Sequence, residues 1–321
     1  LYTLPFEVLI KDGPNTAELI RKYENITQRR NISSFDYVNL PYLLKDHPIA
    51  YLPSVSVLYS VRTFLKDGYG KWREPLVAFA DPVFCPRELK KKGKDAFLNR
   101  GANFALFAMR GSGTLTDSDP CKVLPRLSAT ADEVKAIART LKAPKKPFLR
   151  EEAKETALKT IDLRPYRYVT IATHGLLAGE FKVNQPSLVL SLVGDGKNDG
   201  LLEMDEVLGL DIHAELVTLS ACNTSAAEGG TDKGEGFVGL TRSFMFAGTP
   251  SVLVTHWSVE SETTRDLMIK VHQMITAKGR ARALRDAKID MIGRYVDIGE
   301  TRISTAHPFF WGGFVIVGDG R

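Results

Sequence analysis

Short apolar runs alternate with segments of helical period along most of the chain. From Leu76 onward six runs are mainly apolar rather than alternating, which is typical of strands covered on both faces. These runs are Leu76–Ala80, Pro147–Leu149, Tyr168–Thr173, Leu216–Ser220, Ser251–His256 and Phe314–Val317. Because helical segments separate them, the pattern predicts an α/β fold with a mostly parallel six-stranded sheet and helices on both faces.

Four helices are predicted between these strands. Thr130 and Glu133 have the spacing of a capping box. Behind them apolar residues recur on one helical face, at Val134, Ile137, Ala138 and Leu141. Three further stripes predict helices around Ala153–Ile161, Phe237–Phe244 and Thr264–Ile275, and Gly248 can end the helix that contains Phe237.

The first 75 residues show weaker periodicity. Leu4–Ile10 has the pattern of a strand, Ile49–Leu58 is a second apolar segment, and Thr16–Tyr23 carries one helical stripe. We expect residues 1–75 to form an N-terminal lobe that extends the core of residues 76–321. Because an apolar segment is already in progress near Leu1, we also expect the chain to be a piece of a longer protein.

Composition is that of an ordinary globular protein. Hydrophobic residues make up 44% and charged residues 25%, and 43 Lys plus Arg against 38 Asp plus Glu give a net charge of +5. This balance argues against disorder and against a dedicated nucleic-acid-binding tail. The lysine-rich stretches Arg87–Lys94 and Lys142–Lys146 lack an aromatic or glycine pattern, so we interpret them as solvated loops and expect nucleic acid as a partner only indirectly, if at all. No run approaches the ~18 apolar residues of a membrane span, so no membrane partner is expected.

The three cysteines, Cys85, Cys121 and Cys222, are widely spaced. They form neither an even disulfide framework nor a paired metal knuckle, so a reducing, cytoplasmic location is expected. Without clustered ligands, we expect no metal and no cofactor.

Chemistry is expected at the carboxyl ends of the strands, where open parallel sheets bind their ligands. The third predicted strand leads into His174 and Gly175, and the fourth into Cys222. If the two strands are neighbours, the histidine and the cysteine emerge about 5 Å apart, and we expect both side chains at solvent-facing strand ends rather than in the core. A cysteine nucleophile needs a base because the thiolate reacts and the free thiol ionises only near pH 8.5. Backbone amides of Gly175 and Cys222 are the candidate donors to an oxyanion.

Alternatives to this dyad remain open. His174 and Cys222, taken singly, also fit a loop histidine and a small buried residue. His256 ends the fifth strand beside Trp257, and if the strands are ordered in space as they are along the chain, we expect it to lie one strand too far from Cys222 to act as base. Cys85 and Cys121 have no histidine at a matching strand end, and no serine-hydrolase elbow or phosphate-binding loop is present.

Several short motifs together resemble one family. They are Leu4-Pro5-Phe6-Glu7, Tyr51-Leu52-Pro53-Ser54, Ala80-Asp81-Pro82-Val83-Phe84, Ala172-Thr173-His174-Gly175, Gly200-Leu201-Leu202, Leu219-Ser220-Ala221-Cys222-Asn223-Thr224, Ala247-Gly248, Trp257-Ser258-Val259, His307-Pro308 and Phe310-Trp311. This combination is similar to the CHAT family of caspase-like cysteine peptidases, in the clan of caspases and separase. The resemblance implies a caspase-type sheet, a His174 and Cys222 dyad, and an upstream tetratricopeptide-repeat region or a regulatory partner protein. Ser220 stands where metacaspases have an aspartate, two residues before the cysteine.

Two functions follow as hypotheses. The first is a cysteine endopeptidase acting on a protein substrate, and the second is a catalytically silent peptidase-fold scaffold or interaction module. For the endopeptidase we expect a basic residue before the cut bond, because Asp81 ends the first strand and a carboxylate can pair with a guanidinium. Asp81 fits a cap of the turn before Pro82 equally well. Glu203, Asp205 and Glu228 are the fallback acids.

Two further regions complete the predicted site. Trp257 and Ser258, at the exit of the fifth strand, are candidates for a substrate-binding wall, although Trp257 also fits a core tryptophan. The glycine-rich and acidic stretch Ser225–Gly236 predicts a mobile loop that a partner could order to switch the enzyme on, or else a plain surface connection.

Overall fold

The computed structural model describes most of the chain. The described ranges are residues 5–13, 16–18, 21, 37–64, 72–89, 119–220, 233–257, 261–298 and 301–321. Within them no helix is both long enough and apolar enough to cross a bilayer.

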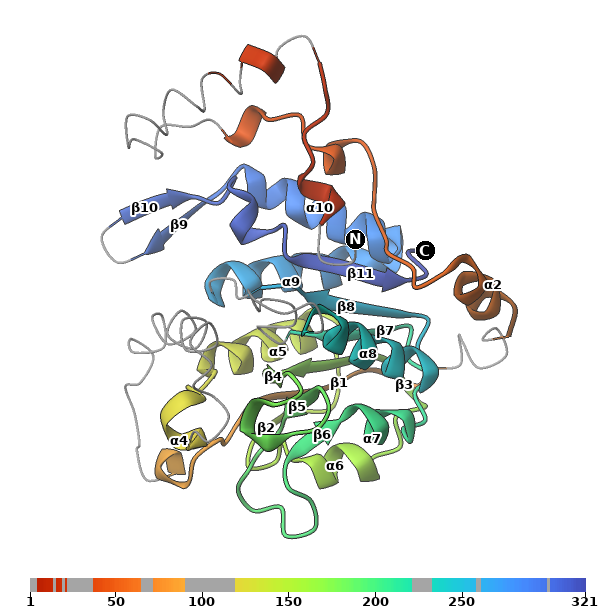
Figure 1. The fold of residues 1–321 in the computed structure, drawn as a ribbon, viewed down its shortest axis with the longest axis vertical. Helices are drawn as coiled ribbons and strands as arrows, with labels where there is room; N and C mark the ends of the chain where they lie inside the picture. Colours follow the sequence, from red (N-terminus) through yellow and green to blue (C-terminus); the bar gives the residue numbers. More distant parts are fainter. Residues whose placement is uncertain are drawn as a thin grey trace.

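All six predicted strands are present and form one sheet (Figure 1). In spatial order they are β11 (Phe314–Gly318), β8 (Ser251–Thr255), β7 (Leu216–Leu219), β3 (Tyr166–Ala172), β1 (Glu74–Pro82) and β2 (Phe148–Arg150). Every neighbouring pair is parallel except β11 with β8. The predicted α/β class with a mostly parallel six-stranded sheet is therefore confirmed.

Helices cover both faces because successive strand residues point to opposite sides. In β1, Leu76, Ala78 and Ala80 join one core cluster, whereas Val77 and Phe79 join the other. The first cluster includes residues of α5 (Ser128–Thr140), α9 (Ser261–Lys278) and α10 (Arg280–Ile292). The second includes residues of α6 (Glu155–Thr160), α7 (Met204–Leu208) and α8 (Lys233–Phe246). Both faces of the strands are therefore buried under helices, which explains why the strand sequences are continuously apolar.

The predicted helices exist, but one cap differs. No side chain caps α5 at its N-terminus: Thr130 donates its hydroxyl to the carbonyl oxygen of Leu127, and Glu133 turns inward. The predicted capping box is therefore wrong. Gly248 follows α8 with φ +114°, where a Cβ would lie 2.4 Å from the carbonyl oxygen of Ile212, so glycine is required there.

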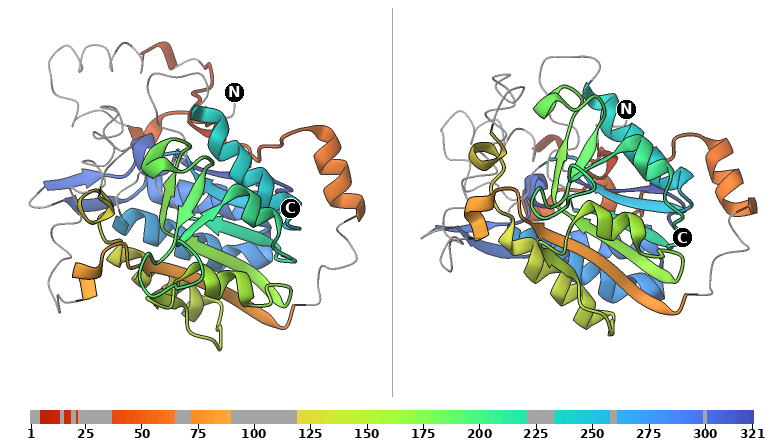
Figure 2. Two further views of the ribbon diagram at one scale, coloured as in Figure 1. Left: turned by 60° about the horizontal axis from the view of Figure 1, so that its bottom comes forward. Right: turned by 90° about the horizontal axis from the view of Figure 1, so that it is seen from below.

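Short elements account for the rest of the described chain. A second, antiparallel sheet contains β4 (His174–Leu176), β5 (Ser187–Val189) and β6 (Leu201–Glu203), and β9 (Tyr295–Ile298) pairs with β10 (Thr301–Ser304). Two further α-helices are α2 (Val55–Phe64), which stands apart from the body of the chain in Figure 2, and α4 (Pro120–Val123). The 3₁₀ helices are η1 (Phe6–Val8), η3 (Tyr37–Asn39), η4 (Leu43–Lys45), η6 (Pro86–Leu89), η7 (Glu180–Lys182) and η8 (Pro308–Phe310).

The N-terminal segment packs into the main core. Tyr42 is buried edge-on against Trp311 with ring centroids 4.9 Å apart, and Tyr51 forms a bridge with β11. Glu7 lies in η1, a 3₁₀ helix rather than the predicted strand, and it is buried between Tyr51 and Lys288 of α10. These contacts agree with a lobe that extends the same core, while the boundary at residue 75 stays a prediction.

Candidate active site

The strands that lead to the two candidate catalytic residues are direct neighbours. Ile171 of β3 pairs with Leu219 of β7, and the backbone N–H of Ser220 donates to the carbonyl oxygen of Ile171 at 3.1 Å. His174 and Cys222 follow these paired residues at equal distances along their chains. The predicted adjacency of the two strands is therefore confirmed, although Cys222 itself lies outside the described residues.

His174 is held at the junction of the two sheets. Strand β3 of the main sheet ends at Ala172, and His174 is the first residue of β4 in the small sheet. Between them, the hydroxyl of Thr173 donates to the carbonyl oxygen of Val189 in β5. Its side chain is fully buried, and its ring lies 4.9 Å from that of Phe84. We expected a solvent-facing histidine, and this expectation is wrong: the aromatic contact and the small sheet enclose the ring.

One hydrogen bond defines the chemistry of the His174 ring. Its Nε2 lies 2.8 Å from the carbonyl oxygen of Pro125. A carbonyl oxygen can only accept, so Nε2 carries the proton and Nδ1 is the basic nitrogen of the neutral ring. The contribution of Pro125 was not predicted, because a backbone carbonyl leaves no mark in the sequence.

Asp81 is engaged by arginines of the same chain. Its side chain is 2% exposed, and its carboxylate accepts from Arg126 Nη2 at 2.8 Å and Arg126 Nε at 3.0 Å. Arg150 adds a bond from Nη1 at 3.1 Å and reaches Glu88 with Nη2 at 2.9 Å. The structure thus contradicts the predicted role of Asp81 in binding a substrate arginine, because two guanidinium groups already occupy the carboxylate.

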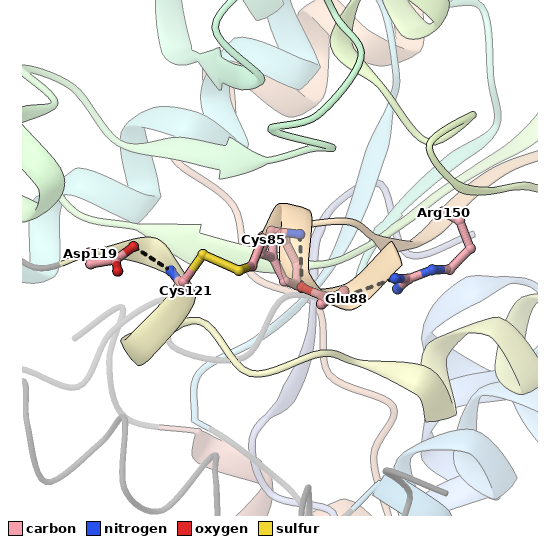
Figure 3. Close-up of a disulfide and its surroundings, with 6 residues drawn as sticks. Cys85, Glu88, Asp119, Cys121 and Arg150 are labelled. Carbon is pink, nitrogen blue, oxygen red and sulfur yellow. Dashed lines mark hydrogen bonds and ion pairs between the residues drawn. A yellow bond between two sulfur atoms is a disulfide. The ribbon is translucent and has the colours of Figure 1, made fainter. Parts of the chain in front are cut away.

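A disulfide lies at the end of this ionic network (Figure 3). Cys85, next to η6, is bonded to Cys121 of α4, and Asp119 caps α4 by accepting from the backbone N–H of Cys121 at 3.0 Å. Glu88 of η6, three residues after Cys85, accepts a hydrogen bond from Arg150, as Figure 3 shows. The expectation of unpaired cysteines is wrong, and with it fails the argument for a reducing location.

The other predicted site residues are placed as follows. Gly175 lies in β4 and pairs with Leu188, so its backbone is part of the small sheet. Trp257 is half-buried, and its indole N–H donates to the carbonyl oxygen of Phe309 at 2.9 Å. Ser258 lies outside the described residues. The indole bond gives Trp257 a packing role, so its part in substrate binding stays a prediction.

The alternative base His256 lies closer to β7 than expected. Val254 of β8 pairs with Leu219, so β8 adjoins β7 on the side opposite β3, and our expectation that His256 lies one strand too far from Cys222 is wrong. Burial lowers the pKa of His256 to about 4, while Glu7 acts in the opposite direction and Lys288 adds to the lowering. An imidazole with so low a pKa is a weak base at neutral pH, which favours His174.

One fallback acid lies in the small sheet with His174, and a second follows that sheet directly. Glu203 in β6 pairs with Ser187 of β5, which pairs with Leu176 of β4, and Asp205 follows in α7. Burial raises the pKa of Glu203, and neighbouring carboxylates add to the effect. The third acid, Glu228, lies outside the described residues, as does most of the predicted loop; only Lys233–Gly236 are described, and they begin α8.

Metal chemistry finds no support in the described part of the chain, where no three His, Cys, Asp or Glu side chains are grouped to hold an ion. No curated protein matches the sequence. The family model of the CHAT domain matches residues 1–319, which is essentially the whole chain. With the six-stranded sheet and the adjacent strand ends in place, the chain belongs to the CHAT domain family, which is related to the caspase-like peptidases.

Proposed function

We propose that the protein is a cysteine endopeptidase in which His174 is the base and Cys222 the nucleophile. The observation that carries the proposal is the hydrogen bond from His174 Nε2 to the carbonyl oxygen of Pro125, because it fixes the ring and makes Nδ1 the proton acceptor. The pairing of β3 with β7 supports it, since the two residues follow neighbouring strand ends. Membership of a caspase-like family agrees with this reading.

The reaction follows from these roles. Nδ1 of His174 takes the thiol proton of Cys222, and the thiolate attacks the carbonyl carbon of the scissile peptide bond. Backbone amides of Gly175 and Cys222 are the proposed donors to the oxyanion. The imidazolium then gives its proton to the leaving amine, and water attacks the thioester to release the acyl product and restore the thiol.

A protein substrate with a basic residue before the cut bond is the proposed specificity. The family resemblance supports it, and Asp81 no longer does. Glu203 lies in β6 of the small sheet that contains His174, Asp205 lies in α7 directly after that strand, and these two acids are the proposed binding groups. Activation by an upstream repeat region or a partner protein is part of the same proposal.

The test is cleavage of a diverse peptide library, read by mass spectrometry, with Cys222→Ala and His174→Ala. Both substitutions should abolish cleavage, whereas His213→Ala, at a half-exposed histidine paired with Asp211, should leave it unchanged. Circular dichroism must accompany His174→Ala, because removing a fully buried ring leaves a cavity beside Phe84. Cleavage that survives Cys222→Ala would refute the dyad. Absence of any cleavage by the full-length protein with its partner would favour the scaffold function instead.

A further inference from the structure

One short segment contacts the ends of three neighbouring strands. The carbonyl oxygen of Pro125 holds the ring of His174 after β3. Thr130 accepts a hydrogen bond from the backbone N–H of Asp81 in β1 at 2.9 Å, through its side-chain oxygen. Glu133 accepts from the hydroxyl of Ser220, directly after β7, at 3.3 Å. The segment from Pro125 to Glu133, which runs into the first turns of α5, therefore braces the sheet edge on which the candidate dyad depends.

Glu133 is the least expected member of this brace. Its side chain is 2% exposed, and Ser220 is its one hydrogen-bond partner among the described residues. The second carboxyl oxygen, Oε1, is buried with no partner there, and no described cation forms an ion pair with Glu133. Burial raises the pKa of the carboxyl to about 7, while the hydrogen bond from Ser220 acts in the opposite direction.

Folding alone does not explain an acid at this position. A buried carboxyl with one oxygen unpaired costs free energy that a leucine of similar size would avoid. The neighbours of Glu133 on the same helix, Val134 and Ile137, are fully buried and apolar, so the surroundings would accept an apolar residue. Residues that break a packing rule in this way concentrate at functional sites.

We propose that Glu133 is a positioning residue for the candidate nucleophile, because its carboxyl oxygen holds the Ser220 hydroxyl and so fixes the end of β7 two residues before Cys222. This inference rests on the proposed endopeptidase function. The role needs a hydrogen-bond acceptor and not a charge, since the Ser220 hydroxyl donates the bond. A glutamine oxygen can replace the carboxyl oxygen, whereas a leucine cannot.

Kinetics of four variants test the proposal. Glu133→Leu and Ser220→Ala should each lower kcat by about 10- to 100-fold with KM little changed, because small misplacements of a reacting group cost rates of this order. Glu133→Gln should retain activity within about threefold, as a conservative rescue. The double variant Glu133→Leu/Ser220→Ala should lose no more than the worse single variant, because both changes break the same bond.

The matched control is Thr218→Val. Thr218 is a buried hydroxyl on the same strand, two residues before Ser220, and its Oγ1 has no hydrogen-bond partner among the described residues. Its replacement should leave kcat unchanged. The melting temperatures of Glu133→Leu and Ser220→Ala should stay within a few degrees of wild type, which separates positioning from a general loss of fold.

A second readout does not depend on peptidase activity. With Cys85 and Cys121 in the disulfide, Cys222 is the remaining thiol, so its alkylation rate by iodoacetamide is measured directly. Glu133→Leu and Ser220→Ala should change this rate by about fivefold or more, and Glu133→Gln should restore it. Rates within twofold of wild type in both folded variants would overturn the proposal. If the full-length wild type cleaves nothing even with its partner, the endopeptidase proposal fails, yet the alkylation rates still decide the role of Glu133.

Discussion

Replacing Glu133 by glutamine should stabilise the protein at neutral and alkaline pH and leave its stability unchanged in acid. The unfolded chain ionises this carboxyl near pH 4.5, whereas burial in the fold raises its pKa to about 7. Between these values the unfolded state binds fewer protons than the folded state, so the stability of the wild type falls as pH rises. Glutamine does not titrate and keeps the hydrogen bond with Ser220.

The magnitude follows from the two pKa values. At about 1.4 kcal/mol for each pH unit between them, the folded wild type loses roughly 3 kcal/mol between pH 4.5 and pH 7, and no more above that. Below pH 4.5 a neutral carboxyl and an amide of the same shape should differ little. The gain from Glu133→Gln should therefore be near zero at pH 4, about half complete near pH 6, and close to its full size at pH 8.

Equilibrium unfolding in urea at pH 4, 6 and 8 measures this difference. The neighbouring Asp132 supplies the control, since it is exposed on the same helix and Asp132→Asn should not reproduce the gain. The reasoning is refuted if the gain from Glu133→Gln is independent of pH, or if the wild type becomes the more stable protein as pH rises.

Three further predictions concern stability. Lys288→Met leaves Glu7 buried without its cation and should cost about 3–5 kcal/mol, while the double variant Lys288→Met/Glu7→Gln should recover much of that in thermal melts. Cys85→Ser removes the bridge to Cys121 and should cost about 2–4 kcal/mol in urea unfolding, and native wild type should show one reactive thiol before reduction and three after reduction and denaturation. Gly248→Ala forces a side chain into left-handed backbone against a carbonyl oxygen and should destabilise by more than about 1 kcal/mol; an unchanged melting temperature would contradict this.

The sequence predicted the main sheet well because both of its faces are buried. Runs such as those of β7 and β8 are continuously apolar, and this signal survives without any knowledge of their neighbours. The three-residue strands β4, β5 and β6 were missed because so short a segment carries no period. The 3₁₀ helix at η1 was mistaken for a strand for the same reason.

For the site, the sequence predicted where in the sheet the candidate residues lie better than it predicted which groups contact them. The carboxyl-end rule located His174 beside the end of β7, but it could not show that a backbone carbonyl holds the ring. The assignment of Asp81 failed because its partners lie far away in the chain, Arg126 at 45 positions and Arg150 at 69. Ion pairs between residues so far apart in the chain depend on how the chain folds, and the local sequence pattern around Asp81 does not indicate them.

The bridge between Cys85 and Cys121 turns the intervening stretch into a closed covalent ring, since the two cysteines are 36 positions apart. A single proteolytic cut inside that ring would leave the two products joined, so an oxidised sample would keep its full mass on a gel and separate into two bands only after reduction. The ends of β1 and α4 would stay tethered to each other throughout. Nicking between these cysteines would therefore change the connectivity of the backbone without releasing either part of the chain.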